Sequence, residues 1–387
     1  MANEVKRILS DIQKLAPEIA ARATEIEAAR TLPPDLIEKL KSIGIFRICV
    51  PRSHGGFELD LPEILEIIEA LSKTDGAIGW TAGIAAGGPV FASLLPPVTF
   101  DLIFRKNPDT IFAGTAPPSG TAEPAPGGWR VSGRWPFASG CQHADWMVGF
   151  CVMTEDGKPL PGPAGESGQP LVKGFVLPAR YWQIEDTWHA AGLKGTGSHH
   201  VALHDAFVSE ANFFDLATSR PCIPGPLYQA PQHYVLLTHS PMALGIAQGA
   251  LDDLIALARS GRQQQRAPLP LRNSEIFQYE LGRIAADLKA ARAFYQVELA
   301  RYWRHALAGT LRDEALLVEG LQSTIWITAA CLRVADACFA LGGSSTVYGS
   351  SPLQRRMRDL HAVAQHHAAQ QRHYLEAGKL LLNAPSN

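Results

Sequence analysis

The stretch SGRWPFASGCQHADW, residues 132–146, decides how the rest of the chain is organised. Small, polar and aromatic residues follow one another in it, and two glycines and a proline interrupt it, which is typical of a strand with a bulge and a turn. Similar short runs lie on both sides, at 129–132, 146–153, 173–177 and 200–208, with Gly and Pro clusters between them. Residues 111–215 are therefore predicted to form an antiparallel β domain.

The sequence on either side of this region has a helical period. Apolar residues recur every three or four positions from Glu4 to about Ile103, and Pro33-Pro34 marks a helix start. After Pro226 the same period predicts four long helices, at about 233–261, 274–307, 313–341 and 351–382. The chain is expected to be mainly α with a central β domain: a helical domain at 1–110, the β domain at 111–215 and a helical bundle at 216–387.

Composition and charge exclude several classes of protein. The 387 residues are 46% hydrophobic and 19% charged, which indicates a globular chain. The 35 Lys and Arg nearly balance the 37 Asp and Glu, for a net charge of −2, and they form no basic run, so nucleic acid is not an expected partner. The six cysteines form no CxxC pair and are expected to be reduced.

No targeting segment or membrane span is predicted. The charged N-terminus lacks the apolar stretch of a signal peptide. The long uncharged stretch 76–100 contains several glycines and prolines, which favours a packed helix and its loop over a span. The cytoplasm is the expected location.

Two motif hypotheses fail on their context. The glycine-rich loop 192–197 precedes a predicted strand, whereas a Rossmann phosphate loop precedes a helix. His200 and His204 lie on one face of that strand without Cys or carboxylate partners at a metal-binding spacing. No nicotinamide dinucleotide site and no metal site are predicted.

Histidines gather in the last predicted helix. His366 and His373, seven residues apart, are expected to share a face with Asp359. His361 lies five residues before His366, about 140° around the helix, so these two do not form a chelating pair. The cluster suggests an acid–base histidine rather than a metal site.

Five segments in this order resemble the acyl-CoA dehydrogenase superfamily over nearly the whole chain. They are LPPDLIEKLKSIGIFRICVP at 32–51 followed by His54-Gly-Gly, the 132–146 segment, Gly195-Thr-Gly-Ser198, Gly342-Gly343 and Arg358-Asp359. Within the superfamily the chain looks most like the group D flavin-dependent monooxygenases, the oxygenase halves of two-component systems that act on 4-hydroxyphenylacetate, dibenzothiophene or indole. The resemblance implies an N-terminal helical domain, an antiparallel β domain and a C-terminal four-helix bundle.

The residues that separate the two activities favour the monooxygenase. The resemblance implies that a dehydrogenase would carry a Glu in one of two places, nine residues after the Arg of the Arg-Asp pair or in the first long bundle helix. In this chain the first place holds His367, and the second, near Val235, has no Asp or Glu between 231 and 240. An acyl-CoA dehydrogenase or related flavin oxidase is the enzyme alternative, and a non-catalytic scaffold of the same fold is the alternative of another class.

The resemblance implies two catalytic residues. Arg358, Asp359, His361 and His366 match a pattern of Arg-Asp-x-His with a further His eight residues after the Arg. His366 is implied as the proton-handling histidine, with a pKa near neutrality, and His361 and His367 are alternatives for this role. Ser139 is implied to steady the C4a-hydroperoxide of the reduced flavin by a hydrogen bond near N5.

The same resemblance implies the residues that bind the flavin. Thr115, Phe137, Ala138 and Ser139 approach the isoalloxazine, and Gly342 and Gly343 approach the adenosine of a flavin bound mainly by a neighbouring subunit. The Arg-x-x-Phe-Gly pattern that holds the pyrophosphate is missing, and Arg262 or Arg266 is its loose substitute.

The implied function is that of an oxygenase component. It takes FADH2 or FMNH2 from a separate NAD(P)H-dependent flavin reductase and uses O2 to hydroxylate or epoxidise a small aromatic or heteroaromatic compound. Residues 76–100 lack the second active-site histidine of certain phenol hydroxylases, which favours an indole-like substrate. The resemblance also implies a homotetramer.

Overall fold

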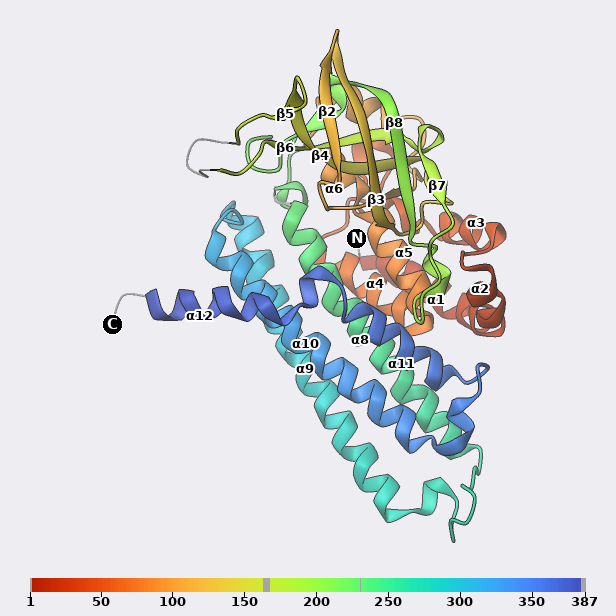
Figure 1. Ribbon diagram of the computed structural model, residues 1–387. Helices are drawn as coiled ribbons and strands as arrows, with labels where there is room; N and C mark the ends of the chain where they lie inside the picture. The colour runs from red at the N-terminus through yellow and green to blue at the C-terminus, as the bar shows by residue number, and fades with distance from the viewer. Residues whose placement is uncertain (1, 163–167, 230, 384–387) are drawn as a thin grey trace.

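The computed structural model describes residues 2–162, 168–229 and 231–383, and it has the predicted order of helices, strands and helices (Figure 1). The helices before the sheet are α1 (Ala2–Ala21), α2 (Ala23–Ala29), α3 (Pro34–Ile43), α4 (Leu61–Thr74), α5 (Gly76–Ala86), α6 (Gly88–Ala92) and α7 (Pro97–Phe104). Asp75 starts α5, because its side chain accepts the backbone N–H groups of Ala77 and Ile78. The uncharged stretch 76–100 thus forms short, mostly buried helices.

A mixed sheet follows these helices. Its strands are β1 (Phe112–Gly114), β2 (Gly120–Ala125), β3 (Gly128–Ala138), β4 (Trp146–Glu155), β5 (Lys158–Pro159), β6 (Val172–Pro178), β7 (Gln183–Glu185), β8 (His199–Ser209) and β9 (Phe213–Phe214). They are ordered β7-β8-β3-β2-β4-β6-β9, and β1 and β5 also pair with β4.

The prediction of a purely antiparallel domain is wrong for two strand pairs. β1 and β2 run parallel to β4, while the other pairs are antiparallel. β3 lies between β2 and β8 and is antiparallel to both. The next strand, β4, therefore pairs with the other edge of β2, and residues 139–145 connect β3 to it. β4 then runs in the same direction as β2.

The helices after the sheet are α8 (Pro231–Arg259), α9 (Glu275–Ala308), α10 (Glu314–Leu341), α11 (Pro352–Val363) and α12 (Tyr374–Asn383). The first three agree with the predicted long helices. The fourth prediction, a helix over 351–382, is wrong, because α11 ends at Val363 and two 3-10 turns follow, η9 (His367–Ala369) and η10 (Gln371–His373). α12 points away from the other helices (Figure 1).

The break after α11 moves His366 out of the helix. Its backbone is extended, with ψ 147°, and its ring accepts the N–H of Ala368, so His366 starts η9 instead of continuing α11. His366 and His373 therefore do not share a helix face with Asp359. The angle of about 140° between His361 and His366 also loses its basis, since only His361 is helical.

One apolar core joins helices from both ends of the chain. α4 and α5 pack with α8, α9 and α10, and the sheet has a core of its own around Trp135 and Phe175. Gly245 of α8 lies so close to α4 that a β-carbon on it would be 2.4 Å from the carbonyl oxygen of Glu69. α8 and α10 are long and apolar enough to cross a membrane by length and composition alone, but they contribute to this shared core.

Candidate active site

Ser139 lies directly after β3, at the end of a chain of hydrogen bonds. It is 6% exposed, and its Oγ accepts a hydrogen bond from Trp80 Nε1 of α5 at 3.0 Å. Ser198 Oγ lies 2.7 Å from Ser139 Oγ, and Thr196 Oγ1 lies 2.6 Å from Ser198 Oγ. Thr196 belongs to the 3-10 turn η4 (Lys194–Thr196), and its hydroxyl donates to the carbonyl oxygen of Leu193 at 2.8 Å.

The direction of this chain follows from the single proton that each hydroxyl carries. Thr196 gives its proton to the Leu193 carbonyl, so Ser198 must donate to Thr196. Ser139 must then donate to Ser198, since the Ser198 proton is already used. The Ser139 oxygen accepts from Trp80 and keeps one lone pair. Toward a ligand, Ser139 is therefore a hydrogen-bond acceptor.

Three aromatic rings meet beside Ser139. The ring of His366 lies 5.3 Å from that of Trp80, nearly perpendicular to it. His239 of α8 stacks on His366 at 5.2 Å and meets Trp80 edge-on at 5.8 Å. His239 is 2% exposed, and its Nε2 is buried without a hydrogen-bond partner among the described residues. We call Trp80, His239 and His366 the ring cluster.

Burial makes both histidines of the ring cluster neutral near pH 7. It lowers the pKa of His366 to about 4, with a smaller contribution from His367, and the pKa of His239 well below its usual value. The expectation of a pKa near neutrality for His366 is therefore wrong. His366 Nδ1 accepts the N–H of Ala368 at 3.3 Å, so the proton of the neutral ring sits on Nε2. His366 thus presents an N–H donor.

The two alternative histidines lie outside the ring cluster. His361 is exposed, and its Nε2 lies 2.9 Å from Asp336 Oδ1 on α10. His367 is also exposed, and its ring meets that of His373 edge-on at 4.7 Å. Of the three neighbouring histidines, the fold brings only His366 to Trp80 and Ser139.

Two of the residues expected to contact a flavin ring have groups free for a ligand: Phe137 has an exposed ring, and Thr115 has an unpaired hydroxyl among the described residues. Phe137 is 62% exposed and has a φ of 64°, a strained conformation for a bulky residue. Ala138, next to it, is fully buried. Thr115 is 9% exposed, and its Oγ1 is buried without a partner among the described residues, as is the Oγ1 of Thr81 on α5. An open aromatic ring and unpaired hydroxyls fit a planar group with polar edges, such as a flavin.

The predicted adenosine and pyrophosphate residues lie together, away from Ser139. Gly342 and Gly343 follow α10, and Arg266 is exposed in the loop after α8. Gln264 of that loop donates to the carbonyl oxygen of Leu341 at 3.0 Å, and a β-carbon on Gly343 would be 2.5 Å from Gln264 Nε2. α11, about 18 Å long at 1.5 Å per residue, separates this turn from His366.

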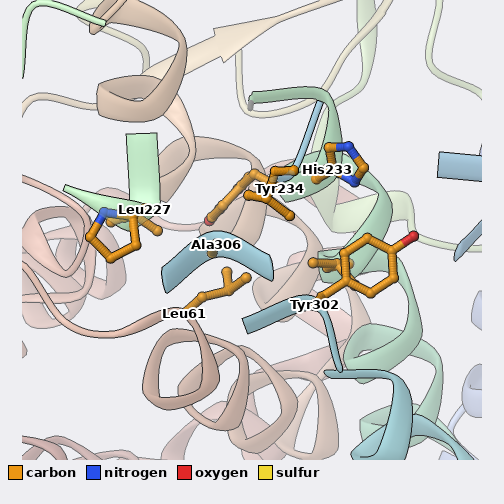
Figure 2. Close-up of a pocket in the computed structure, with 9 residues that line it drawn as sticks. Leu61, Leu227, His233, Tyr234, Tyr302 and Ala306 are labelled. Atoms are coloured by element: carbon orange, nitrogen blue, oxygen red, sulfur yellow. The ribbon is translucent and has the colours of Figure 1, made fainter. Parts of the chain in front are cut away.

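The cavity in Figure 2 belongs to another part of the bundle. It has a volume of about 10 Å³, room for one water molecule, and it lies between α4, α8 and α9. His233 and Tyr302 line it, together with Leu61 and Tyr234. His233 Nδ1 is buried there without a partner among the described residues. α8 therefore carries two buried histidines, of which only His239 reaches the ring cluster.

The sequence patterns do not reveal Trp80 and His239 as site residues. Trp80 lies in 76–100, which lacks the histidine of certain phenol hydroxylases, and His239 lies in 231–240, which lacks the Glu of a dehydrogenase. The available signal is a pair of histidines among mostly apolar residues, His233 and His239, close to the place where a dehydrogenase would carry its carboxylate. Such a histidine is more often a core residue, so the pattern by itself does not identify a site.

Comparison with known proteins places these observations in a family context. Residues 4–93 match the acyl-CoA dehydrogenase N-terminal domain, and residues 237–371 match the acyl-CoA dehydrogenase C-terminal domain. The chain is 34% identical to the indole-3-acetate monooxygenase of Pseudomonas putida over 348 residues. The aligned region covers 89% of this chain and 86% of that protein. It is 30% identical over 384 residues to the FADH(2)-dependent resorcinol hydroxylase, oxygenase component, of Rhizobium sp., covering 93% and 90%. The structure of XiaF from Streptomyces sp. in complex with FADH2 and glycerol has a TM-score of 0.90 at 24% identity, covering 100% of this chain and 98% of XiaF.

Proposed function

The chain belongs to the acyl-CoA dehydrogenase superfamily, in its branch of flavin-dependent monooxygenases, and from this premise we propose that it hydroxylates or epoxidises a small, uncharged, indole-like aromatic compound. It is the oxygenase component of a two-component system and uses reduced flavin and O2. When bound, reduced flavin would supply the two electrons that activate O2, one atom of which goes to the substrate while the other leaves as water. The observation that carries the proposal is the ring cluster of neutral side chains beside Ser139.

Each residue of the site has a stated part in this proposal. The lone pair of Ser139 Oγ would accept the N–H that reduced flavin carries at N5, and Phe137 and Thr115 would hold the ring system. His366 Nε2–H donates to the oxygen or substrate atom that lies before it. Trp80 and His239 exclude water and form an aromatic wall, because both side chains are buried.

The neutral histidines favour an aromatic compound that reacts without losing a proton first. His366 holds its proton on Nε2 and so does not start as a base toward a phenol. In the part of the chain that the structure describes, no Lys or Arg is hydrogen-bonded to or stacked on the ring cluster, so the cluster itself offers no cation to a substrate carboxylate. Indole meets both conditions, whereas indole-3-acetate and phenols meet only one each.

Turnover with a supplied reductase tests the function. Purified chain with NADH, FAD and indole is expected to leave indole unchanged, because residues 192–197 precede β8 and form no Rossmann phosphate loop. Adding a flavin reductase is expected to start oxygenation, with indole preferred to indole-3-acetate and resorcinol. Brisk NADH oxidation by the chain alone would contradict the two-component assignment, and a preference for indole-3-acetate would contradict the uncharged substrate.

A dehydrogenase is disfavoured by the same geometry. The position nine residues after Arg358 is His367, which is exposed, and the ring cluster includes no carboxylate among the described residues. Removal of an α-proton from an acyl thioester needs such a base.

His239 Nε2 is proposed to orient the substrate, because it is buried and unpaired beside His366 among the described residues. His239→Phe keeps an aromatic ring against Trp80 and His366 but removes the nitrogen. The KM for indole is expected to rise by about 10-fold, the value of one neutral hydrogen bond, with a smaller change in kcat. His233→Phe is the matched control, since His233 is equally buried on α8 but lines the cavity of Figure 2. Equal effects of the two variants would argue against this role.

The chain is also proposed to act as a homotetramer in the cytoplasm. Large apolar side chains are exposed on the last helices: Ile276, Tyr279, Val297 and Leu307 on α9, Trp326 on α10, and Leu375, Leu381 and Leu382 on α12. Contact between copies would cover them. The turn at Gly342 and Gly343 would then serve the flavin of a neighbouring copy. All six cysteines are free thiols, which suits a reducing compartment.

A further inference from the structure

A buried carboxylate lies at the other end of the hydrogen-bond chain that reaches Ser139. Asp359 of α11 is 3% exposed, and its Oδ1 accepts the backbone N–H of Leu193 at 2.7 Å. The carbonyl of the same residue, Leu193, accepts the Thr196 hydroxyl. The hydrogen-bond chain therefore runs from Trp80 through Ser139, Ser198 and Thr196 to the Leu193 carbonyl, and Asp359 holds the N–H of the same residue, which belongs to the preceding peptide group.

The packing around Leu193 shows that this contact is tightly held. Leu193 has a φ of 50°, an unfavourable conformation for a residue with a β-carbon. A β-carbon on Gly192 would lie 2.0 Å from the carbonyl oxygen of Arg358, so the loop rests directly on the backbone of α11. A β-carbon on Gly195 would lie 2.3 Å from Ile26, so η4 also packs closely against α2. The strained turn is thus enclosed by packing and anchored by Asp359.

We propose that Asp359 is a positioning residue: by holding the Leu193 N–H it fixes the turn that places the Leu193 carbonyl, and this carbonyl, as the acceptor of the Thr196 hydroxyl, keeps the Ser139 oxygen an acceptor. The role of Ser139 toward the flavin rests on the proposed function. The contact between Asp359 and η4 does not.

The charged groups that face Asp359 come from three elements. Asp75 precedes α5, Glu27 lies on α2, and Arg355 lies on α11. Burial, together with the carboxylates of Asp75 and Glu27, raises the pKa of Asp359 to about 7, although the Leu193 N–H and Arg355 act in the opposite direction. A carboxyl with a raised pKa stabilises the fold below its ordinary value of 3.8, and this stabilisation is lost as the pH rises through about 7.

Amide exchange and coupling together test the proposal. In Asp359→Ala, the amide hydrogens of 191–198 are expected to exchange at least ~10-fold faster, because the Leu193 N–H loses its buried acceptor. Hydrogen peroxide released per reduced flavin is expected to rise. Asp359→Asn, whose amide oxygen still accepts from Leu193, is expected to restore slow exchange and most of the coupling. The melting temperature of the parent is expected to fall relative to that of Asp359→Asn between pH 5 and pH 8, because the Asp359 carboxyl ionises in this interval and the asparagine amide does not.

Two controls separate the outcomes. Asp336→Ala removes an exposed carboxylate of α10 and is expected to change neither readout. Ser198→Ala breaks the chain between Thr196 and Ser139 and is expected to raise peroxide release while the exchange at Leu193 stays slow; it serves as the test if Asp359→Ala does not fold. Unchanged exchange in Asp359→Ala, or Ser198→Ala with parental coupling, would overturn the proposal. If neither the parent nor any variant oxygenates an aromatic compound, the proposed function is wrong. Amide exchange in Asp359→Ala would still show whether Asp359 holds the turn at Leu193.

Discussion

His366→Ala is expected to slow oxygenation of indole by ~100-fold or more while leaving the binding of reduced flavin nearly unchanged. His366 is the only one of its neighbours that reaches Trp80 and His239 among the described residues, and it presents Nε2–H to the site. Alanine removes this donor from the site. Stopped-flow absorbance of each variant, mixed with reduced flavin, O2 and substrate, measures the oxygenation step separately from the reaction of flavin with oxygen.

His361→Ala is the control for this experiment. The side chain of His361 is exposed and pairs with Asp336 on α10, so its loss is expected to change the oxygenation rate less than ~2-fold, as for most surface substitutions. The circular dichroism and melting temperature of both variants show whether they fold. If His361→Ala is the more damaging, or if His366→Ala reacts at the parental rate, the catalytic histidine has been assigned to the wrong residue.

The ionisation of His366 gives this variant a second readout. Burial lowers the pKa of His366 from 6.5 to about 4, so the neutral ring stabilises the fold above pH 6.5, and this contribution is lost as the pH falls from 6.5 through about 4. The melting temperature of His366→Ala is expected to fall less than that of the parent over this interval. The oxygenation rate of the parent should show no step near pH 6.5 from this residue.

Ser139→Ala is expected to release several times more hydrogen peroxide per reduced flavin consumed. The substitution removes the acceptor proposed for the N–H at flavin N5, a hydrogen bond worth ~1–3 kcal/mol, and it leaves Trp80 Nε1 buried without its partner. Product formed per NADH should fall by the same factor. Peroxide assays with and without catalase measure the loss of coupling.

Ser132→Ala is the matched control for Ser139→Ala. Ser132 lies on the same strand, but it is exposed and its hydroxyl accepts the N–H of Asp205 on β8, far along the strand from Ser139. Its coupling is expected to equal that of the parent. Parental coupling in Ser139→Ala would show that the hydroxyl does not contact the flavin, whatever the role of His366.

Local sequence determines the order of helices and strands, because helical periodicity and helix caps depend on residues a few positions apart. The helical period of 275–308 and the Asp75 cap of α5 depend on neighbours three or four positions away. The resemblance to relatives also singles out Ser139 and His366 as residues that prove to lie close to the same Trp80 ring system. Such motifs carry over because the chain order around them is the same.

Tertiary structure alone decides the chemistry of the site. No Gly or Pro follows Val363 until 378, so only the structure shows that α11 ends there; His366 caps η9, and its ring packs against Trp80 and His239. The neutral state of His366 comes from burial by segments that are over 100 residues away in the chain. The acceptor role of Ser139 depends on a proton order that starts at the Leu193 carbonyl and passes through Thr196 and Ser198. Periodicity and spacing report on neighbours along the chain, whereas burial and hydrogen-bond direction are set by partners that only folding brings together.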